Sequence, residues 1–148
     1  MSKLWILVAD SSRARIFTTE SSKAPLVELK EFDHAESRMH ERDLTSDLPG
    51  RSYDSVGQGR HDMEPSTAVK EIEAQAFARE VAEYLESSVK QKRCNRLVIA
   101  AAPAFLGLLR EIVSQRIRSI IRYEFDKNFT QLTAQQIRRL LPERLPMA

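Results

Sequence analysis

Apolar residues at the start of the chain follow patterns typical of β-strands. Residues 3–10, KLWILVAD, form a continuous apolar run between polar residues, which predicts a strand buried on both faces. In residues 13–20, RARIFTTE, apolar and polar side chains alternate, and residues 25–33, PLVELKEFD, alternate less regularly. Because short connections join these three segments, the sequence predicts an antiparallel meander.

The second half of the chain combines helical and strand patterns. Apolar residues recur every three or four positions after Pro65, Ser66 and Thr67, which predicts a helix from Pro65 to about Gln91. Four further elements are expected in alternation: a strand at 96–102, a helix opening at Pro103, a strand at 120–128 and a helix at 133–141.

The helix expected after Pro103 carries one apolar stripe. The residues of this stripe are Phe105, Leu109, Ile112, Val113 and Ile117. A strand, a helix and a strand within about thirty residues form a parallel crossover. Together with the meander, this predicts an α/β fold with a mixed sheet and helices packed on it.

Residues 34–65 show no sustained period and contain the breakers Pro49, Gly50, Gly57 and Gly59. The sequence therefore predicts a long loop over 34–65. Glycines on both sides of Gln58 would let the backbone approach another molecule closely. The side-chain amide of Gln58 both donates and accepts hydrogen bonds, which suits it to orienting a water molecule. A flexible surface loop that ends at a helix cap would need none of these features, and the physics of the sequence alone favours it.

Length and composition indicate one domain spanning residues 1–148, large enough for a substantial core. Cys94 is the single cysteine, so an internal disulfide is excluded and a reducing compartment is expected. The apolar run over 4–9 is too short for a signal peptide or a membrane span. We therefore expect a cytoplasmic protein with no membrane partner.

The formal net charge of +2 conceals a strong asymmetry between the two halves of the chain. Residues 1–89 hold 11 basic and 17 acidic side chains, whereas residues 90–148 hold 12 basic and 4 acidic ones. A basic half of this kind favours an anionic partner such as nucleic acid. The candidate phosphate contacts are Arg60, His61, Arg110, Arg116, Arg118 and Arg122.

Other chemistry has weaker support in the sequence. The three histidines, His34, His40 and His61, lack the spacing of a metal site, so we expect no metal and no cofactor. Asp10 ends the first buried strand, where it could anchor a metal-dependent nuclease or simply cap a turn. The basic neighbours of Cys94 in KQKRCNR would lower the pKa of its thiol if they surround it in space.

Three segments together resemble a known bacterial family. LWILVADSSRARIF (4–17), AAPAFLGLLR (101–110) and EFDKNFTQLTAQQIRRLL (124–141) are similar to the host-attachment family, described as required for attachment to host cells. That family in turn resembles the middle domain of archaeal and eukaryotic class 1 translation release factors. The resemblance implies an RNase H-like α/β fold with five strands in the order 3-2-1-4-5.

The same resemblance implies a role for the stretch VGQGRH. In the release-factor domain a Gly-Gly-Gln loop precedes the long helix, and its glutamine helps position water against the peptidyl-tRNA ester. Gly57 and Gln58 match the last two residues of that motif, whereas Val56 stands in place of the first glycine. By this resemblance the catalytic candidates are Gln58, Gly57 and Gly59, and any effect on attachment would be indirect.

Three functions therefore follow as hypotheses. The first is a protein that binds RNA or the ribosome in translation or ribosome rescue, with peptidyl-tRNA hydrolysis as its catalytic form. The second is a non-catalytic regulatory or interaction module in the cytoplasm. The third is a metal-dependent nuclease built on Asp10, with Asp33, Glu124 and Asp126 available as further carboxylates.

Overall fold

A computed structural model describes residues 3–34 and 56–147, and for 56–67 it describes the backbone alone. In chain order the elements are β1 (Leu4–Ala9), β2 (Arg13–Thr18), β3 (Val27–Asp33), α2 (Val56–Lys90), β4 (Arg96–Ala101), α3 (Pro103–Ile112), α4 (Gln115–Ile120), β5 (Ile121–Phe125) and α5 (Ala134–Leu140). Residues 35–55 of the predicted loop lie outside the described residues.

The five strands form one mixed sheet in the order β3-β2-β1-β4-β5. The pairs β1–β2 and β2–β3 are antiparallel, whereas β1–β4 and β4–β5 are parallel. The predicted meander, the parallel crossover and the α/β class are therefore confirmed. The strand order is also the one that the family resemblance implies.

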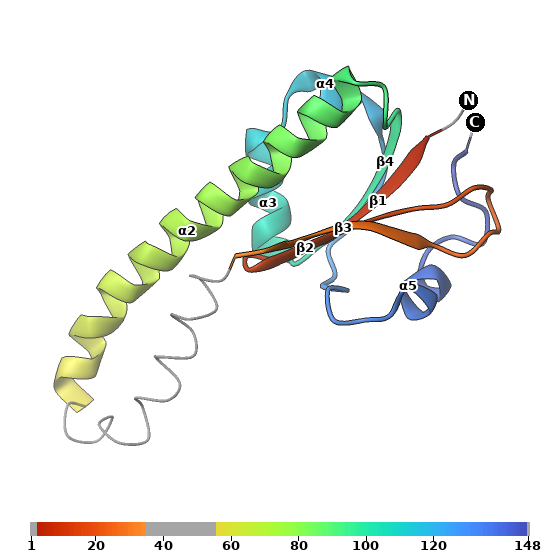
Figure 1. The fold of residues 1–148 in the computed structure, drawn as a ribbon. Coiled ribbons are helices and arrows are strands. Elements are labelled where there is room, and N and C mark those ends of the chain that lie inside the picture. Colours follow the sequence, from red (N-terminus) through yellow and green to blue (C-terminus); the bar gives the residue numbers. More distant parts are fainter. Residues whose placement is uncertain (1–2, 35–55, 148) are drawn as a thin grey trace.

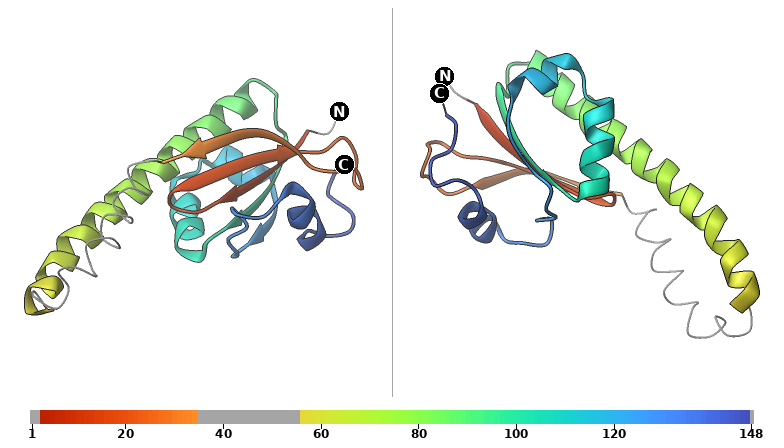
Figure 2. Two further views of the ribbon diagram at one scale, coloured as in Figure 1. Left: turned by 60° about the horizontal axis from the view of Figure 1, so that its bottom comes forward. Right: turned by 180° about the vertical axis from the view of Figure 1, so that it is seen from behind.

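The sheet is covered on both faces, which gives the protein three layers (Figure 1). Helices α2, α3 and α4 lie on one face, and α5 with the C-terminal segment lies on the other (Figure 2). All six residues of β1 are buried, because alternate side chains enter the two cores. Trp5 and Leu7 pack in the first core, whereas Ile6 and Val8 pack in the second.

Helix α2 begins at Val56, so the predicted start at Pro65 is wrong and residues 56–65 are helical rather than a loop. Pro65 lies inside the helix, where its ring removes the hydrogen bond that its N–H would give to the carbonyl of His61. Proline is more common in the first turn of a helix than in its interior, and for this reason the sequence predicts a helix start at Pro65.

The N-terminal part of α2 extends well beyond the sheet (Figures 1 and 2). The first buried residue described on this helix is Ala74. At 1.5 Å per residue, Val56 lies about 27 Å along the helix axis from Ala74. No helix in the described residues is both long enough and apolar enough to cross a membrane.

The segment after Pro103 forms two helices, so the single helix predicted there is wrong. Helix α3 ends at Ile112, and Val113 is extended with φ −66° and ψ 147°. Ser114 then serves as the N-cap of α4, because its side chain accepts a hydrogen bond from the backbone N–H of Ile117. A serine that can cap a new helix competes with continuation of the old one.

Candidate nucleic-acid interface

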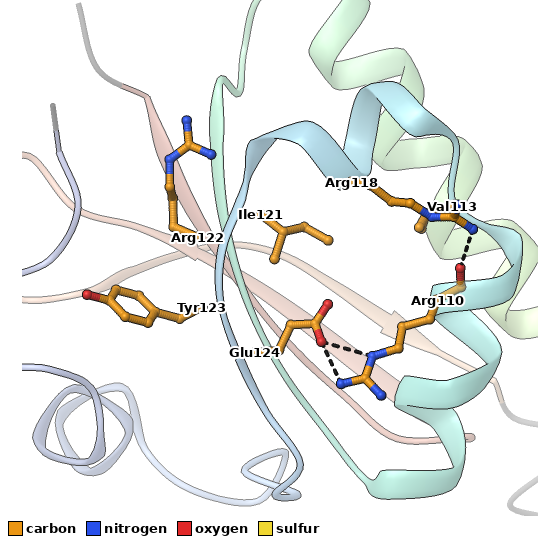
Figure 3. Close-up of a pocket in the computed structure, with 7 residues that line it drawn as sticks. All are labelled: Arg110, Val113, Arg118, Ile121, Arg122, Tyr123 and Glu124. Atoms are coloured by element: carbon orange, nitrogen blue, oxygen red, sulfur yellow. Dashed lines mark hydrogen bonds and ion pairs between the residues drawn. The ribbon is translucent and has the colours of Figure 1, made fainter.

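Three arginines line a groove between α3, α4 and β5. The side chains of Arg110 and Arg118 lie on the α3 side of β5, whereas that of Arg122 leaves β5 on the other side (Figure 3). This groove has a volume of about 600 Å³. We call it the arginine groove, and its lining residues are Arg110, Val113, Arg118, Ile121, Arg122, Tyr123 and Glu124. The groove therefore joins side chains from three consecutive elements at the β5 edge of the sheet.

Ser114 ties the start of α4 to the body of the protein. Its hydroxyl donates to Oε2 of Glu86 on α2 at 2.7 Å and accepts from the N–H of Ile117 at 3.2 Å. Because α2 packs on the sheet, these contacts hold α4 beside α3. Arg118 on α4 can then reach back to α3, where its Nη2 donates to the carbonyl of Arg110 at 2.6 Å.

An ion pair joins Arg110 and Glu124 at one side of the groove (Figure 3). Nε and Nη2 of Arg110 donate to Oε1 of Glu124 at 2.9 and 2.6 Å. The Arg110 side chain is 59% exposed, so solvent screens the pair, and its net stabilisation is only about 0.2–1 kcal/mol. Its main consequence is to fix where the Arg110 guanidinium lies.

The groove carries an excess of positive charge. Its three arginines and one glutamate give a formal charge of +2. Arg118 donates to the backbone carbonyl of Arg110, and Arg122 donates to that of Ser119. Because a carbonyl has no formal charge, these hydrogen bonds do not neutralise the two arginines. A guanidinium has five N–H donors in a planar fork, so both side chains can also bind a phosphate.

A second hollow of about 440 Å³ adjoins the first. Ile120 lines this hollow and the next residue, Ile121, lines the arginine groove. Lys3 and Lys92 contribute two more cations to it, and Nζ of Lys3 donates to the carbonyl of Lys92 at 2.5 Å. The positive surface therefore continues from β5 toward the C-terminal end of α2.

Of the arginines predicted to contact phosphate, three line the arginine groove: Arg110, Arg118 and Arg122. The Arg122 side chain points to the side of β5 away from the other two (Figure 3). Arg116 is exposed on α4 and does not line this groove. Arg60 and His61 belong to the first turns of α2, where the structure describes the backbone alone.

The proposed catalytic residues Gly57, Gln58 and Gly59 also lie in the first turns of α2. A helical backbone has negative φ, so the positive φ expected for a tight glycine loop is not used there. The N-terminal part of α2 extends away from α3 and α4 (Figure 1), so the structure separates these residues from the arginine groove.

Asp10 caps the turn between β1 and β2. Its Oδ1 accepts hydrogen bonds from the N–H groups of Ser12 and Arg13 at 2.9 and 2.8 Å. Its Oδ2 accepts from Asn128 and Thr130, both at 3.0 Å. Burial opposes ionisation of Asp10, but these hydrogen bonds outweigh it and place its pKa below the usual value.

Two of the four carboxylates named for a nuclease are engaged in other contacts. Asp10 holds a turn, and Glu124 pairs with Arg110. Within residues 3–34 and 68–147, whose side chains are described, no group of three His, Cys, Asp or Glu side chains could hold a metal ion.

The Cys94 thiol is buried at the end of the segment that joins α2 to β4. Burial raises its pKa to about 11, despite the basic residues on either side of it in the sequence. The condition for a lowered pKa is therefore not met, because burial outweighs the hydrogen bonds with the backbone of Arg96 and Trp5 that would lower it.

The sequence pattern does not indicate that Tyr123 lines the groove. This side chain is 42% exposed on β5, next to Arg122. Its exposure depends on β5 being at the end of the sheet, which the pattern of residues 120–128 does not reveal.

A family model matches residues 5–141, and its description is "Protein required for attachment to host cells". The chain belongs to this family. The match covers all five strands except Leu4, the arginine groove and the whole of α5, so the groove is built within the family's own domain.

Two further similarities come from individual proteins. The uncharacterized protein RP470 of Rickettsia prowazekii (strain Madrid E) is 30% identical over 79 residues. These residues make up 52% of this chain and 53% of RP470, so the match spans about half of that relative. The crystal structure of the archaeal translation termination factor aRF1 matches 92% of this chain and 36% of its own, with 12% identity and a TM-score of 0.48.

Proposed function

We propose that this host-attachment family protein binds RNA through the arginine groove. The observation that carries the proposal is that Arg110, Arg118 and Arg122 all line one groove at the β5 edge of the sheet, and that this groove has an excess of positive charge. A guanidinium is opposite in charge to a phosphate, and its planar fork can donate two parallel hydrogen bonds to phosphate oxygens. The adjoining hollow with Lys3 and Lys92 lengthens the surface along which a phosphate backbone could lie.

We further propose that the RNA belongs to the translation machinery, either as ribosomal RNA or as tRNA. The support is the sequence resemblance between this family and the release-factor middle domain. The effect on host attachment that gives the family its description would then be an indirect result of altered translation.

A double substitution in the groove tests RNA binding. In Arg118→Gln/Arg122→Gln two groove charges are lost, whereas Arg139→Gln/Arg144→Gln removes the same charge at exposed sites in and after α5. Because Arg139 and Arg144 do not line the arginine groove, we expect only the groove variant to lose affinity, by about tenfold or more. Fluorescence anisotropy of a labelled RNA measures the affinity of each variant. An equal loss of RNA affinity in both variants would contradict the proposal.

A second candidate is hydrolysis of the peptidyl-tRNA ester with Gln58 as the group that orients water. This candidate is supported by the position of Gln58 near the N-terminal end of α2. That end projects from the body of the protein, where a large partner could contact it. We expect Gln58→Ala to abolish release of the peptide from peptidyl-tRNA on ribosomes. Gln75→Ala, at an exposed site further along α2, is the matched control.

The alternative is a non-catalytic interaction module. In that case Gln58→Ala would complement a deletion strain as fully as the wild-type chain does. Full complementation together with intact RNA binding would remove the catalytic proposal and leave the binding proposal in place.

A further inference from the structure

Tyr123 offers an aromatic ring at the edge of the positive surface. The residue is 42% exposed, and its ring stacks against Phe125 with a centroid distance of 6.3 Å and an interplanar angle of 29°. Phe125 in turn packs against the core that α5 covers. The Tyr123 ring is therefore held in place from one side while much of it stays open to solvent.

The local shape of β5 puts this ring beside Arg122, on the side of the strand away from Arg110 (Figure 3). The register between β4 and β5 shifts so that Ile121 lies opposite Leu97 and Tyr123 lies opposite Val98. Arg122 falls within this irregularity, and its side chain and the Tyr123 ring leave β5 on the side away from Ile121 and Glu124 (Figure 3). A phosphate contact and an aromatic surface thus come from consecutive residues.

We propose that the ligand of the arginine groove is single-stranded RNA and that Tyr123 stacks on one of its bases. This inference rests on the proposed RNA binding and adds the strandedness of the ligand. In a duplex the bases are paired and stacked on one another, whereas an unpaired base can turn outward onto an aromatic ring. The arginines supply affinity for phosphates, and the ring supplies a preference for nucleotides whose bases are free.

An abasic oligonucleotide separates base stacking from charge. Two labelled oligoribonucleotides of about 12 nucleotides are compared, one with all its bases and one with the same phosphates but abasic sugars. Stacking contributes a factor of about 5 to 150 per base, so the wild-type protein should bind the complete strand at least fivefold more tightly. Tyr123→Phe should keep this ratio, and Tyr123→Ala should reduce it to near one.

Tyr123→Leu keeps an apolar side chain at this site, so it controls for packing against Phe125. We expect it to bind both strands with the affinity that wild type shows for the abasic one. Annealing the complete strand to its complement should lower wild-type affinity to a similar degree.

The two proposals fail in different ways. If wild type binds the complete, abasic and duplex forms equally, the stacking inference is overturned while RNA binding stands. The same holds if Tyr123→Ala weakens binding to the complete and abasic strands by the same factor. If no form binds at low salt, the RNA-binding proposal is overturned, and the inference falls with it.

Discussion

Among the described residues that line the arginine groove, only Glu124 is acidic. Its carboxylate competes with any phosphate for the guanidinium of Arg110, since both anions need the same N–H donors. We expect Glu124→Gln to raise RNA affinity by up to about fivefold, the value of an exposed ion pair. Titration of both proteins with labelled RNA measures the change.

Glu143→Gln is the control for Glu124→Gln, because it removes the same charge at an exposed site after α5. If Glu124→Gln weakened RNA binding while Glu143→Gln did not, Glu124 would be holding Arg110 in its binding position rather than competing with the ligand.

Asp10 is a residue whose ionisation supports the fold. Because its pKa is lowered in the folded state, its contribution is complete above the unfolded pKa of about 4 and is lost as pH falls through the folded value. Asp10→Asn should cost about 1–3 kcal/mol at neutral pH, and the cost should shrink below about pH 4. Urea unfolding at a series of pH values measures both effects.

Asp126 is exposed, so Asp126→Asn should stay within about 0.5 kcal/mol of wild type and serves as the control. A cost for Asp10→Asn that did not vary with pH would show that the charge of Asp10 is not what stabilises the turn.

The Cys94 thiol is buried and has a pKa of about 11, so at pH 8 only about one molecule in a thousand carries the reactive thiolate. We expect an aromatic disulfide reagent to modify native protein at least a hundredfold more slowly than unfolded protein. Absorbance during labelling with and without urea checks this. Comparable rates would mean that the thiol is accessible in the folded state.

At the scale of single elements, two helix caps make a matched pair. Ser114 caps α4 beside the arginine groove, and Thr133 caps α5 on the opposite face of the sheet, where Gln136 completes a capping box. Alanine at either cap should cost about 1 kcal/mol of stability. Only Ser114→Ala should also lower RNA affinity, because α4 carries Arg118.

Thermal unfolding and RNA titration of Ser114→Ala and Thr133→Ala separate the two effects. If both variants lost RNA affinity equally, the loss would reflect general destabilisation, and the position of α4 would be irrelevant to binding.

The elements differ in how far the sequence predicts them. The strands at Leu4–Ala9 and Arg96–Ala101 were predicted closely because a continuous apolar run fits the buried centre of a sheet. The sequence does not predict the start of α2 correctly, because Pro65 resembles a first-turn proline although it lies inside the helix. The break after Ile112 was missed because the apolar stripe continues to Ile117 across it.

The candidate site was predicted only in part, for a related reason. The charge excess of residues 90–148 indicates the arginines that line the groove. Which of them share a groove depends on the turn at Ser114 and on the pairing of β5 with β4. Those features arise from tertiary contacts. The sequence pattern therefore does not predict that Tyr123 lines the groove or that Gln58 lies far from it.

At the scale of the whole molecule, two regions of different character stand apart. One is the projecting end of α2, which carries Gln58, and the other is the positive surface around β5 and the C-terminal end of α2. A large RNA assembly could contact both regions at once, with the groove providing affinity and the helix reaching further into the partner. A small ligand would fill the arginine groove alone.

The central claim is that phosphate contacts in the arginine groove bind RNA, and its most direct test is the salt dependence of binding. For a single strand, each phosphate contact contributes about 0.7 to the slope of log affinity against log salt concentration. Three groove arginines therefore predict a slope of about −2, falling in magnitude by about 1.4 in Arg118→Gln/Arg122→Gln but not in Arg139→Gln/Arg144→Gln. A slope near zero for wild type, or one that the groove variant leaves unchanged, would contradict the claim.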